Sequence, residues 1–306
     1  TVFSCFFPFR YVLCIIIPQL LILFYLRGIY MKRKDGTRYR GADMLYTIVP
    51  FIMVKRSDAC NALTVHLPYN SMHDYIAAKR AQGVNLSYMT LFIAAYVRTV
   101  AKYPALNRFI VNKRIYSRNS LTVAMVVQRA DGAEGTMSKL DFELTDTVFD
   151  VNRKIMEFVN GNREEDTNDT DGIMRRLTGL MWLMPFAIGL LKWADKHGLL
   201  PKAVLKASPF HASMVISNLA SIRTNHIYHH IYDFGTISQI ITMGNLEYVI
   251  KERDGKTFAE KQLPLGIVCD ERIASGYYYS KCFREIQSLL NHPERLELPP
   301  VSVITD

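Results

Sequence analysis

From Ala42 onward, apolar positions recur with the two periods that distinguish strands from helices. Alternating or continuous apolar runs predict strands at residues 47–53, 63–67, 114–116, 121–128 and 136–144, with a hairpin-like turn at Asp131 and Gly132 between the last two. Apolar positions at helical spacing predict helices at residues 71–81, 88–103 and 145–160, and a helical region at 173–206. The apolar stretch 177–191 within that region, broken by Pro185, is expected to be buried against the sheet or a neighbouring subunit. No long linker or internal repeat interrupts this series, so residues 41–306 are expected to form one α/β domain.

The pattern is sharpest near the C-terminus, where a strand, a polar corner and a helix follow one another. Leu265–Cys269 is apolar and predicts a buried strand, after which Asp270, Glu271 and Arg272 come at once. Beyond Gly276, an amphipathic helix has its apolar positions at Cys282, Phe283, Ile286, Leu289 and Leu290. Functional side chains are often placed at such a corner, because the strand fixes it and a glycine lets the chain turn.

Residues 1–40 differ in composition from the rest of the chain. Phe6 to Leu26 is almost wholly apolar, and a basic flank follows from Arg27 to Arg40. One interpretation is a membrane anchor, since the run approaches the roughly 20 residues of a span and the basic flank would stay cytoplasmic. The other is that residues 1–30 are translated from an upstream region and that Met31 opens the native protein. We expect a cytoplasmic protein unless residues 1–30 anchor it.

Charge and cysteine content narrow the classes of function. The net charge is +9, and residues 1–40 supply most of it, with seven basic residues against Asp35. No basic stripe interleaved with aromatic residues follows, so nucleic-acid binding is not expected. The five cysteines form no Cys-x-x-Cys pair, which argues against a zinc site or a disulfide framework and favours a reduced compartment. The acidic run at 161–171 lacks calcium-loop spacing and predicts a surface loop.

The corner at 270–276 resembles the signature of the chloramphenicol acetyltransferase and dihydrolipoyl acyltransferase superfamily. That family has His-His-x-x-x-Asp-Gly between a strand and a helix. In this chain the same seven places run from Asp270 to Gly276, and the glycine, the strand and the helix match. The histidines and the aspartate do not match: Glu271 stands at the position of the family's base, and Ser275 at the position of its aspartate.

Three further segments carry the same resemblance, in the family's order. The predicted helix at 88–103 runs into Pro104-Ala105-Leu106-Asn107, and this resembles the family's pattern of a long helix that ends in Pro-x-Leu-Asn. The strand leading into Ser217 resembles the segment whose serine donates a hydrogen bond to the tetrahedral oxyanion, although a serine at a strand end also commonly bonds its own backbone. Residues 240–244 resemble a run whose threonine holds a water near the same intermediate, which gives that role to Thr242. The resemblance covers about residues 42–300.

The resemblance implies a chloramphenicol-acetyltransferase-like two-layer α/β fold, with a mixed β-sheet flanked by helices. It also implies acyl transfer between coenzyme A and a thiol or hydroxyl, with no metal, in a homotrimer whose sites lie between subunits. Ser217 and Glu271 are then expected far apart within one chain and close across an interface. The partners would be a small-molecule acyl donor and acceptor, or a lipoyl domain on another chain, because this chain has no lipoyl module of its own.

The departure from the family's corner leaves the catalytic base open. A free Glu has a pKa of about 4.3 and a free His about 6.5, so Glu271 is a weak base at neutral pH unless burial raises its pKa. The adjacent His229 and His230 are the other candidates, and in a strand only one of them could face a given pocket. One hypothesis is a working acyltransferase with one of these three residues as base. The other is a catalytically degenerate member that acts as a structural or regulatory subunit.

Overall fold

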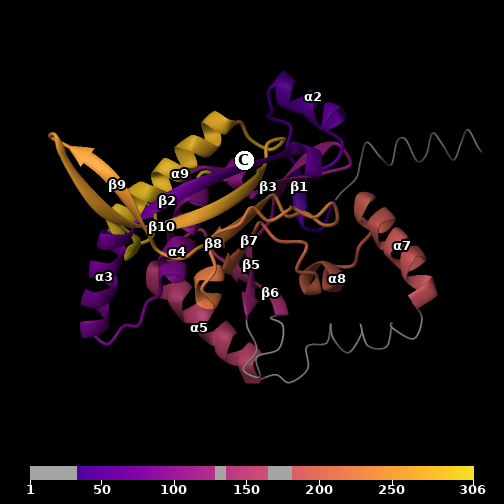
Figure 1. Ribbon diagram of the computed structural model, residues 1–306. Coiled ribbons are helices and arrows are strands. Elements are labelled where there is room, and N and C mark those ends of the chain that lie inside the picture. Colours follow the sequence, from indigo (N-terminus) through magenta and orange to yellow (C-terminus); the bar gives the residue numbers. More distant parts are fainter. Residues whose placement is uncertain (1–32, 128–135, 165–180) are drawn as a thin grey trace, which may run out of the picture.

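The computed structural model describes residues 33–127, 136–164 and 181–306, and a mixed sheet lies at its centre (Figure 1). The strands of this sheet run in the order β2-β10-β8-β7-β5-β6, and β9 pairs with β10. Their bounds are β2 Cys60–Pro68, β5 Leu121–Val127, β6 Thr136–Phe142, β7 Met214–Asn218, β8 Gln239–Met243, β9 Glu247–Arg253 and β10 Lys256–Asp270. Strand β7 is parallel to both of its neighbours, and the other pairs are antiparallel.

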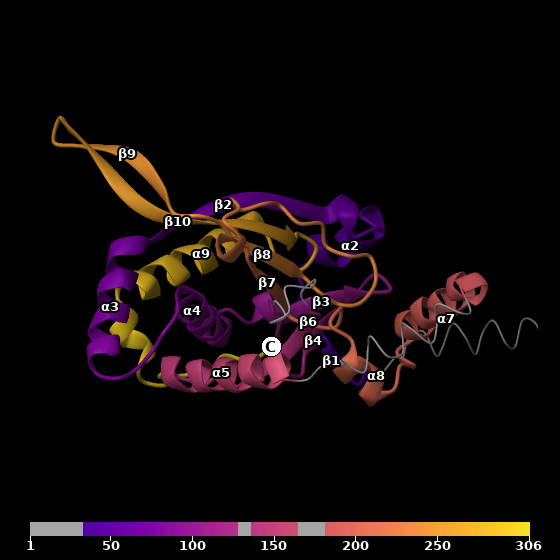
Figure 2. The same ribbon diagram turned by 60° about the horizontal axis from the view of Figure 1, so that its bottom comes forward.

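Helices cover one face of this sheet and enclose the main hydrophobic core (Figure 2). They are α3 Tyr69–Ala81, α4 Tyr88–Lys102, α5 Val148–Glu164 and α9 Gly276–Asn291. Helix α4 is buried along most of its length, begins at the Ser87 cap and ends before Pro104, as its apolar spacing predicts. A smaller apolar cluster on the opposite face lies under the irregular chain that precedes β8. The predicted two-layer α/β fold is therefore confirmed.

A second, three-stranded sheet includes residues that lie ahead of the predicted domain. It consists of β1 Gly36–Arg38, β4 Arg114–Arg118 and β3 Arg108–Val111, in that order. Just before β1, the buried guanidinium of Arg33 forms ion pairs of 2.8 Å with both Asp35 and Asp195. Residues 33–40, grouped above with the N-terminal segment, thus pack against the domain. The apolar run at 6–26, the turn at Asp131 and the acidic run beyond residue 164 lie outside the described ranges.

The prediction of a strand at residues 47–53 was wrong. These residues belong to helix α2, Met44–Ile52, in which the Asp43 side chain accepts a hydrogen bond from the Tyr46 backbone N–H at 3.1 Å. The β-branched, apolar sequence favours a strand. The structure pairs no neighbouring strand with it, however, and the cap at Asp43 satisfies a backbone donor of the first helical turn locally.

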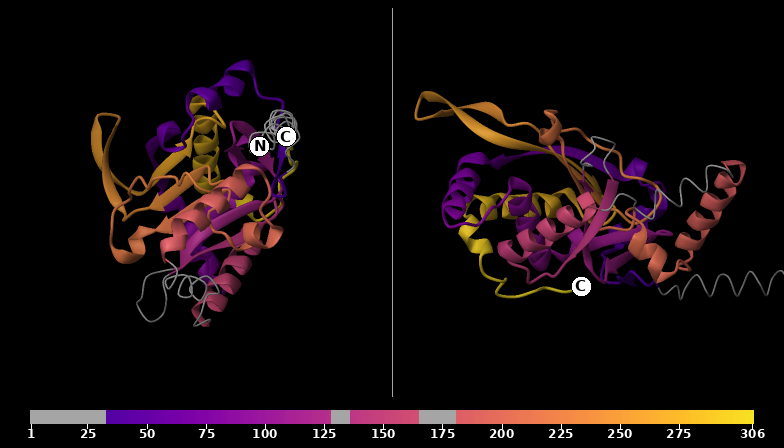
Figure 3. Two further views of the ribbon diagram at one scale, coloured as in Figure 1. Left: turned by 90° about the vertical axis from the view of Figure 1, so that its right-hand side faces the viewer. Right: turned by 90° about the horizontal axis from the view of Figure 1, so that it is seen from below.

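Helix α7, Met184–Lys196, was expected to be buried against the sheet or a neighbouring subunit, and within this chain it is exposed. It stands at the opposite end of the molecule from the long hairpin of β9 and the first half of β10 (Figures 2 and 3). Pro185 lies in its first turn, where a proline is tolerated, instead of breaking it. A short helix, α8 Lys202–Ala207, follows. Across the described residues, no helix has the length and apolar character needed to span a membrane.

Candidate functional site

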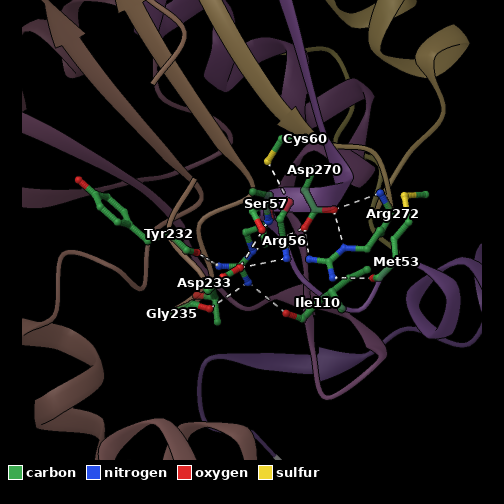
Figure 4. Close-up of polar contacts among 12 residues, drawn as sticks. Met53, Arg56, Ser57, Cys60, Ile110, Tyr232, Asp233, Gly235, Asp270 and Arg272 are labelled. Carbon is green, nitrogen blue, oxygen red and sulfur yellow. Dashed lines mark hydrogen bonds and ion pairs between the residues drawn. The ribbon is translucent and has the colours of Figure 1, made fainter. Parts of the chain in front are cut away.

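The corner between β10 and α9 is held by a buried cluster of charged side chains (Figure 4). Asp270, the last residue of β10, is 1 % exposed. Its two carboxylate oxygens accept hydrogen bonds from the Arg272 Nε and Nη2 atoms at 2.8 and 2.7 Å. Arg56 approaches from another side, with its Nε atom 3.6 Å from the carboxylate. A bidentate pair of this kind fixes direction as well as distance, so the corner is held rigidly.

The two arginines also tie the corner to three distant segments. Arg272 donates to the backbone carbonyl of Met53, at the end of α2, at 3.2 Å. Arg56 donates to the carbonyls of Tyr232 and Gly235, in one segment, at 2.7 and 3.0 Å, and to the carbonyl of Ile110 on β3 at 3.3 Å. Burial lowers the pKa of Arg56, whereas for Arg272 the burial effect is outweighed by hydrogen bonding to Asp270, which raises its pKa. The sequence motifs did not reveal this cluster, because Arg56 is 214 positions from Asp270.

Glu271 lies immediately beyond this cluster and is half-buried. Its backbone N–H donates to the Ala59 carbonyl at 2.9 Å, and its carboxylate accepts a hydrogen bond from the Asn61 side chain at 2.5 Å. Ser275, at the position of the family's aspartate, caps α9: its hydroxyl oxygen accepts the Tyr278 backbone N–H at 3.1 Å. The corner thus presents one carboxylate, and Ser275 serves the helix that follows.

A groove of about 710 Å³ begins beside this corner and follows the edge strand β2 along α9. Asn61 and Gly276 line it near Glu271, while His66 and Gln287 line its other end. Gly276 does not have a positive φ, so the expectation that it is there to let the chain turn was wrong. A Cβ at this position would meet nothing within 4 Å. The open space over Gly276 belongs instead to the groove.

Ser217 and Thr242 lie on one row of residues that crosses four strands. The registers place Ser217 beside Thr242, Thr242 beside Gly266, and Gly266 beside Thr64. Because side chains alternate along a strand, Ser217 and Thr242 point to the face opposite the helices, the face of Val215 and Ile240. Within the described part of the chain, the Ser217 hydroxyl, which is half-buried, has no hydrogen-bond partner.

The chain segment before β8 crosses directly over this row. The Thr242 hydroxyl donates to the Ile227 carbonyl at 2.5 Å and accepts the Ile227 backbone N–H at 3.0 Å. A Cβ on Gly266 would stand 2.3 Å from the same carbonyl, so only glycine allows this approach. In this chain, therefore, the Thr242 hydroxyl fastens the overlying segment to the sheet.

Ser217 and Glu271 are far apart within the chain, as expected. Ser217 is level with Gly266 in the registers, and Glu271 follows Gly266 by five residues along β10. At about 3.3 Å per residue this is roughly 17 Å along the strand, and two strand spacings separate them across the sheet. A reaction that uses both residues requires Ser217 from one copy and Glu271 from another.

His229 and His230 lie in irregular chain and not in a strand, so the argument from alternating faces does not apply to them. The structure brings neither of them into contact with Glu271 or Ser217: His229 Nδ1 bonds the His230 carbonyl at 2.9 Å, and His230 is exposed.

The sequence motifs did not point to His226, yet this histidine contacts Thr64, a member of the row of residues that also contains Ser217 and Thr242. Its Nε2 atom is 3.2 Å from the Thr64 hydroxyl, and its buried Nδ1 atom lacks a hydrogen-bond partner. The same Thr64 hydroxyl bonds the Tyr228 hydroxyl at 2.5 Å. Only the strand register puts Thr64, on β2, next to this segment, so no local signal could have found the group.

The cysteines near the corner are not suited to act as nucleophiles. Burial, followed by the charge of Asp270, raises the pKa of the Cys60 thiol, and burial also raises the pKa of Cys269 and Cys282. Among the described residues, no group of three or more His, Cys, Asp or Glu side chains could hold a metal ion. The chemistry available at the corner is that of the Glu271 carboxylate.

In sequence comparisons, no family model matches the chain, and neither does any curated protein. Among solved structures, it is similar to the dihydrolipoamide acetyltransferase of Azotobacter vinelandii, with a TM-score of 0.56 and 13 % identity over 86 % of this chain and 95 % of that chain. It is also similar to the cubic core of a pyruvate dehydrogenase multienzyme complex (TM-score 0.55, 14 % identity, 86 % and 95 % covered). For a chloramphenicol acetyltransferase the TM-score is 0.51, with 10 % identity and 83 % and 99 % covered.

These similarities define the class of fold. The chain has the α/β fold of chloramphenicol acetyltransferase and of the dihydrolipoamide acetyltransferase catalytic cores, as the motifs at 103–108, 217, 242 and 270–276 predict. At identities of 10 to 14 % the likeness concerns the fold, and the site has to be judged on its own residues.

Proposed function

We propose that this protein is a coenzyme A-dependent acyltransferase that works on an altered active site, with Glu271 as the base. The observation that carries the proposal is the placement of Glu271: a half-buried carboxylate on a corner fixed by the Asp270–Arg272 pair, beside the open space over Gly276. A base needs a fixed position within reach of the acceptor's proton. A rigid corner at the end of a groove supports that role.

In the proposed reaction, Glu271 takes the proton from the thiol or hydroxyl of the acceptor. The acceptor's sulfur or oxygen then bonds to the thioester carbon of acyl-coenzyme A, and the carbonyl oxygen becomes an oxyanion. The unpartnered hydroxyl of Ser217, from a neighbouring copy, donates a hydrogen bond to this oxyanion. As the intermediate collapses, the C–S bond to coenzyme A breaks and the leaving thiolate takes the proton back from Glu271.

The homotrimer is part of the same proposal. The separation of roughly 17 Å along β10 between the levels of Ser217 and Glu271 excludes a site built from both residues of one chain. The similar pyruvate dehydrogenase core is itself part of a larger assembly. A small-molecule acceptor and a lipoyl domain on another chain both remain consistent with the groove.

A catalytically degenerate protein is the second candidate, and two observations favour it. The Thr242 hydroxyl is hydrogen-bonded to the backbone N–H and carbonyl of Ile227, and the Ser275 hydroxyl is hydrogen-bonded to the first turn of α9. Both hydroxyls therefore have structural partners. In the Azotobacter vinelandii enzyme, the roles of a serine, a histidine and an asparagine in catalysis were investigated. At the corner of this chain no histidine is present, and a structural or regulatory subunit would need none.

The two candidates are separated by thiol release from acetyl-coenzyme A, measured with and without small thiol and hydroxyl acceptors. If Glu271 is the base, Glu271→Gln abolishes transfer because the amide cannot accept the proton, while Glu252→Gln on the exposed strand β9 retains it. Gly276→Ala keeps the fold, since its Cβ meets nothing, but lowers turnover by narrowing the groove.

Equal inactivity of the wild type and Glu271→Gln would support the degenerate protein. The double change Glu271→His with Ser275→Asp then tests whether rebuilding the family's corner restores transfer. Activity that survives Glu271→Gln but is lost in His229→Ala or His230→Ala would assign the base to the histidine pair.

A further inference from the structure

Two apolar helices stand exposed at the same end of the molecule. Large apolar side chains are exposed to solvent on α7 and just before it: Trp182 is 79 % exposed and Phe186 is 73 % exposed. On α2, Leu45, Phe51 and Ile52 are exposed as well. Both helices lie at the outer edge of the fold (Figure 1). Exposed apolar side chains scattered singly are normal, but a group of this extent marks an interaction surface.

Between these two helices lies a pocket of about 350 Å³ with a strongly basic lining. Four exposed lysines line it: Lys55 just after α2, Lys113 at the turn between β3 and β4, and Lys192 and Lys196 on α7. Lys113 also lies 5.2 Å from the ring centre of Phe51 on α2, so at this point a lysine of the pocket contacts the exposed apolar side chains of that helix. Within the described part of the chain, none of the four lysines forms an ion pair.

Two acidic groups line this pocket, and both have hydrogen-bond or ion-pair partners. Asp195 is paired with Arg33 at 2.8 Å, and the Asp233 side chain accepts the Arg56 backbone N–H at 3.1 Å. Among the described residues that line the pocket, the four lysines therefore outnumber the acidic side chains, Asp195 and Asp233, and leave a positive charge beside apolar side chains. A surface of another copy that matched this face would need a comparable excess of acidic groups, whereas an anionic lipid headgroup layer supplies both phosphate charge and an apolar interior.

The position at which the chain enters the fold is an independent observation. The apolar run at 6–26 leads to Arg33, and Arg33 is bonded to α7 through both the carboxylate and the carbonyl oxygen of Asp195. Any attachment of the preceding residues to a bilayer would bring this same end of the molecule to the bilayer surface.

We propose that the face formed by α2, α7 and the four lysines binds to the surface of an anionic lipid bilayer. The exposed aromatic and aliphatic side chains enter the headgroup region, where Trp and Phe are favoured, and the lysines lie against lipid phosphates. This holds the groove beside Glu271 close to the membrane surface. The inference rests on the exposed face and does not require the proposed acyl transfer.

The two tryptophans of the chain, Trp182 just before α7 and Trp193 on it, are both exposed and report on the environment of this helix. The full-length protein is mixed with vesicles of phosphatidylcholine, with or without phosphatidylserine. We expect tryptophan emission to shift to shorter wavelength with the phosphatidylserine vesicles, to be quenched by brominated lipid, and to recover at high salt.

Lys192→Glu with Lys196→Glu is expected to weaken binding to these vesicles at least about tenfold, because each lysine near an anionic surface contributes to the attraction. The matched control is Arg253→Glu with Lys256→Glu on the hairpin at the other end of the molecule, which changes the net charge by the same amount and should bind as the wild type does. Both lysines of α7 are exposed and form no ion pair with any residue that the structure describes, so the fold should tolerate the change, and far-ultraviolet circular dichroism checks this.

Three outcomes would overturn the proposal. One is vesicle binding without any quenching of tryptophan, which would assign binding to the residues before Arg33 alone. Another is equal binding by the α7 variant and the wild type. The third is an emission that is already blue-shifted in buffer and moves to longer wavelength on dilution, which would show that a second copy covers this face.

Discussion

The change Asp270→Asn tests whether the buried charge cluster holds the corner together. Asparagine has nearly the same shape as aspartate, so packing is kept and the negative charge is removed. The change replaces one carboxylate oxygen with an NH₂ group that faces guanidinium donors. Arg272, which donates to both oxygens at 2.8 and 2.7 Å, and Arg56, which is 3.6 Å away, are then left as buried cations without their counter-ion.

The expected loss is large because the carboxylate is only 1 % exposed. Removing one partner of a buried ion pair costs about 3–5 kcal/mol of unfolding free energy. A domain is stable by only about 5–15 kcal/mol, so this is a substantial fraction of the total. With a urea m-value of about 3 kcal/mol per M, the midpoint of unfolding should fall by about 1–2 M.

Urea unfolding followed by circular dichroism measures this loss. Asp74→Asn on the exposed side of α3 is the control and should change the unfolding free energy by less than about 0.5 kcal/mol. In the double variant with Arg272→Met, the second change should cost much less than it does alone, since the two side chains interact directly. A loss below about 1 kcal/mol for Asp270→Asn, or strictly additive effects, would refute the view that the cluster holds the corner.

Three further changes test the packing over the sheet and one buried lysine. Gly266→Ala should lower the free energy of unfolding by about 1–3 kcal/mol, because its Cβ would stand 2.3 Å from the Ile227 carbonyl oxygen. The control is Gly161→Ala on α5, where a Cβ meets open space, and it should raise the free energy of unfolding by about 0.5–1 kcal/mol. Urea unfolding measures both changes. Thr242→Val should speed amide hydrogen exchange at Ile227 and cost about 1–3 kcal/mol, and unchanged exchange would count against the fastening role. Burial, and then the charge of Arg118, lower the pKa of Lys139 to about 8 in the folded protein. In the unfolded chain its pKa is about 10.4, so between these two pH values the unfolded state binds more protons than the folded state. The free energy of unfolding should therefore rise with pH across this range. Relative to Lys139→Met, the wild type should therefore gain stability across that range, and a difference independent of pH would contradict the shift.

The elements predicted from periodicity are mostly those observed, and the exceptions have local causes. Helix α4 combines a long apolar pattern with clear end signals, so both its type and its position were predictable. For β10, the apolar run predicted the buried end at 265–269 but not the exposed first part of the strand from Lys256. The segment at 47–53 was misassigned because its β-branched residues favour a strand, while the Asp43 cap and the lack of a pairing strand decide for a helix. For α7, apolar content alone predicted burial, but its packing depends on what the rest of the chain leaves uncovered.

The candidate site was predictable only in part. The motifs located Glu271, Ser275, Ser217 and Thr242 along the sequence, but not what each side chain bonds. The hydroxyls of Ser275 and Thr242 are taken by backbone groups, and these bonds depend on how α9 and the segment around Ile227 lie in space. Likewise, the Asp270–Arg56 ion pair joins positions too distant in sequence for any local pattern to connect.

By itself, the sequence determined the type and order of most strands and helices, the α/β class and the corner at 270–276, because periodicity and capping act between residues a few positions apart. The tertiary structure decided which side chains meet. It placed Ser217 and Glu271 on different parts of the sheet, buried Asp270 between two arginines, and left α2 and α7 uncovered. Those outcomes depend on strand register and on long-range packing, which join residues that no short stretch of sequence contains together.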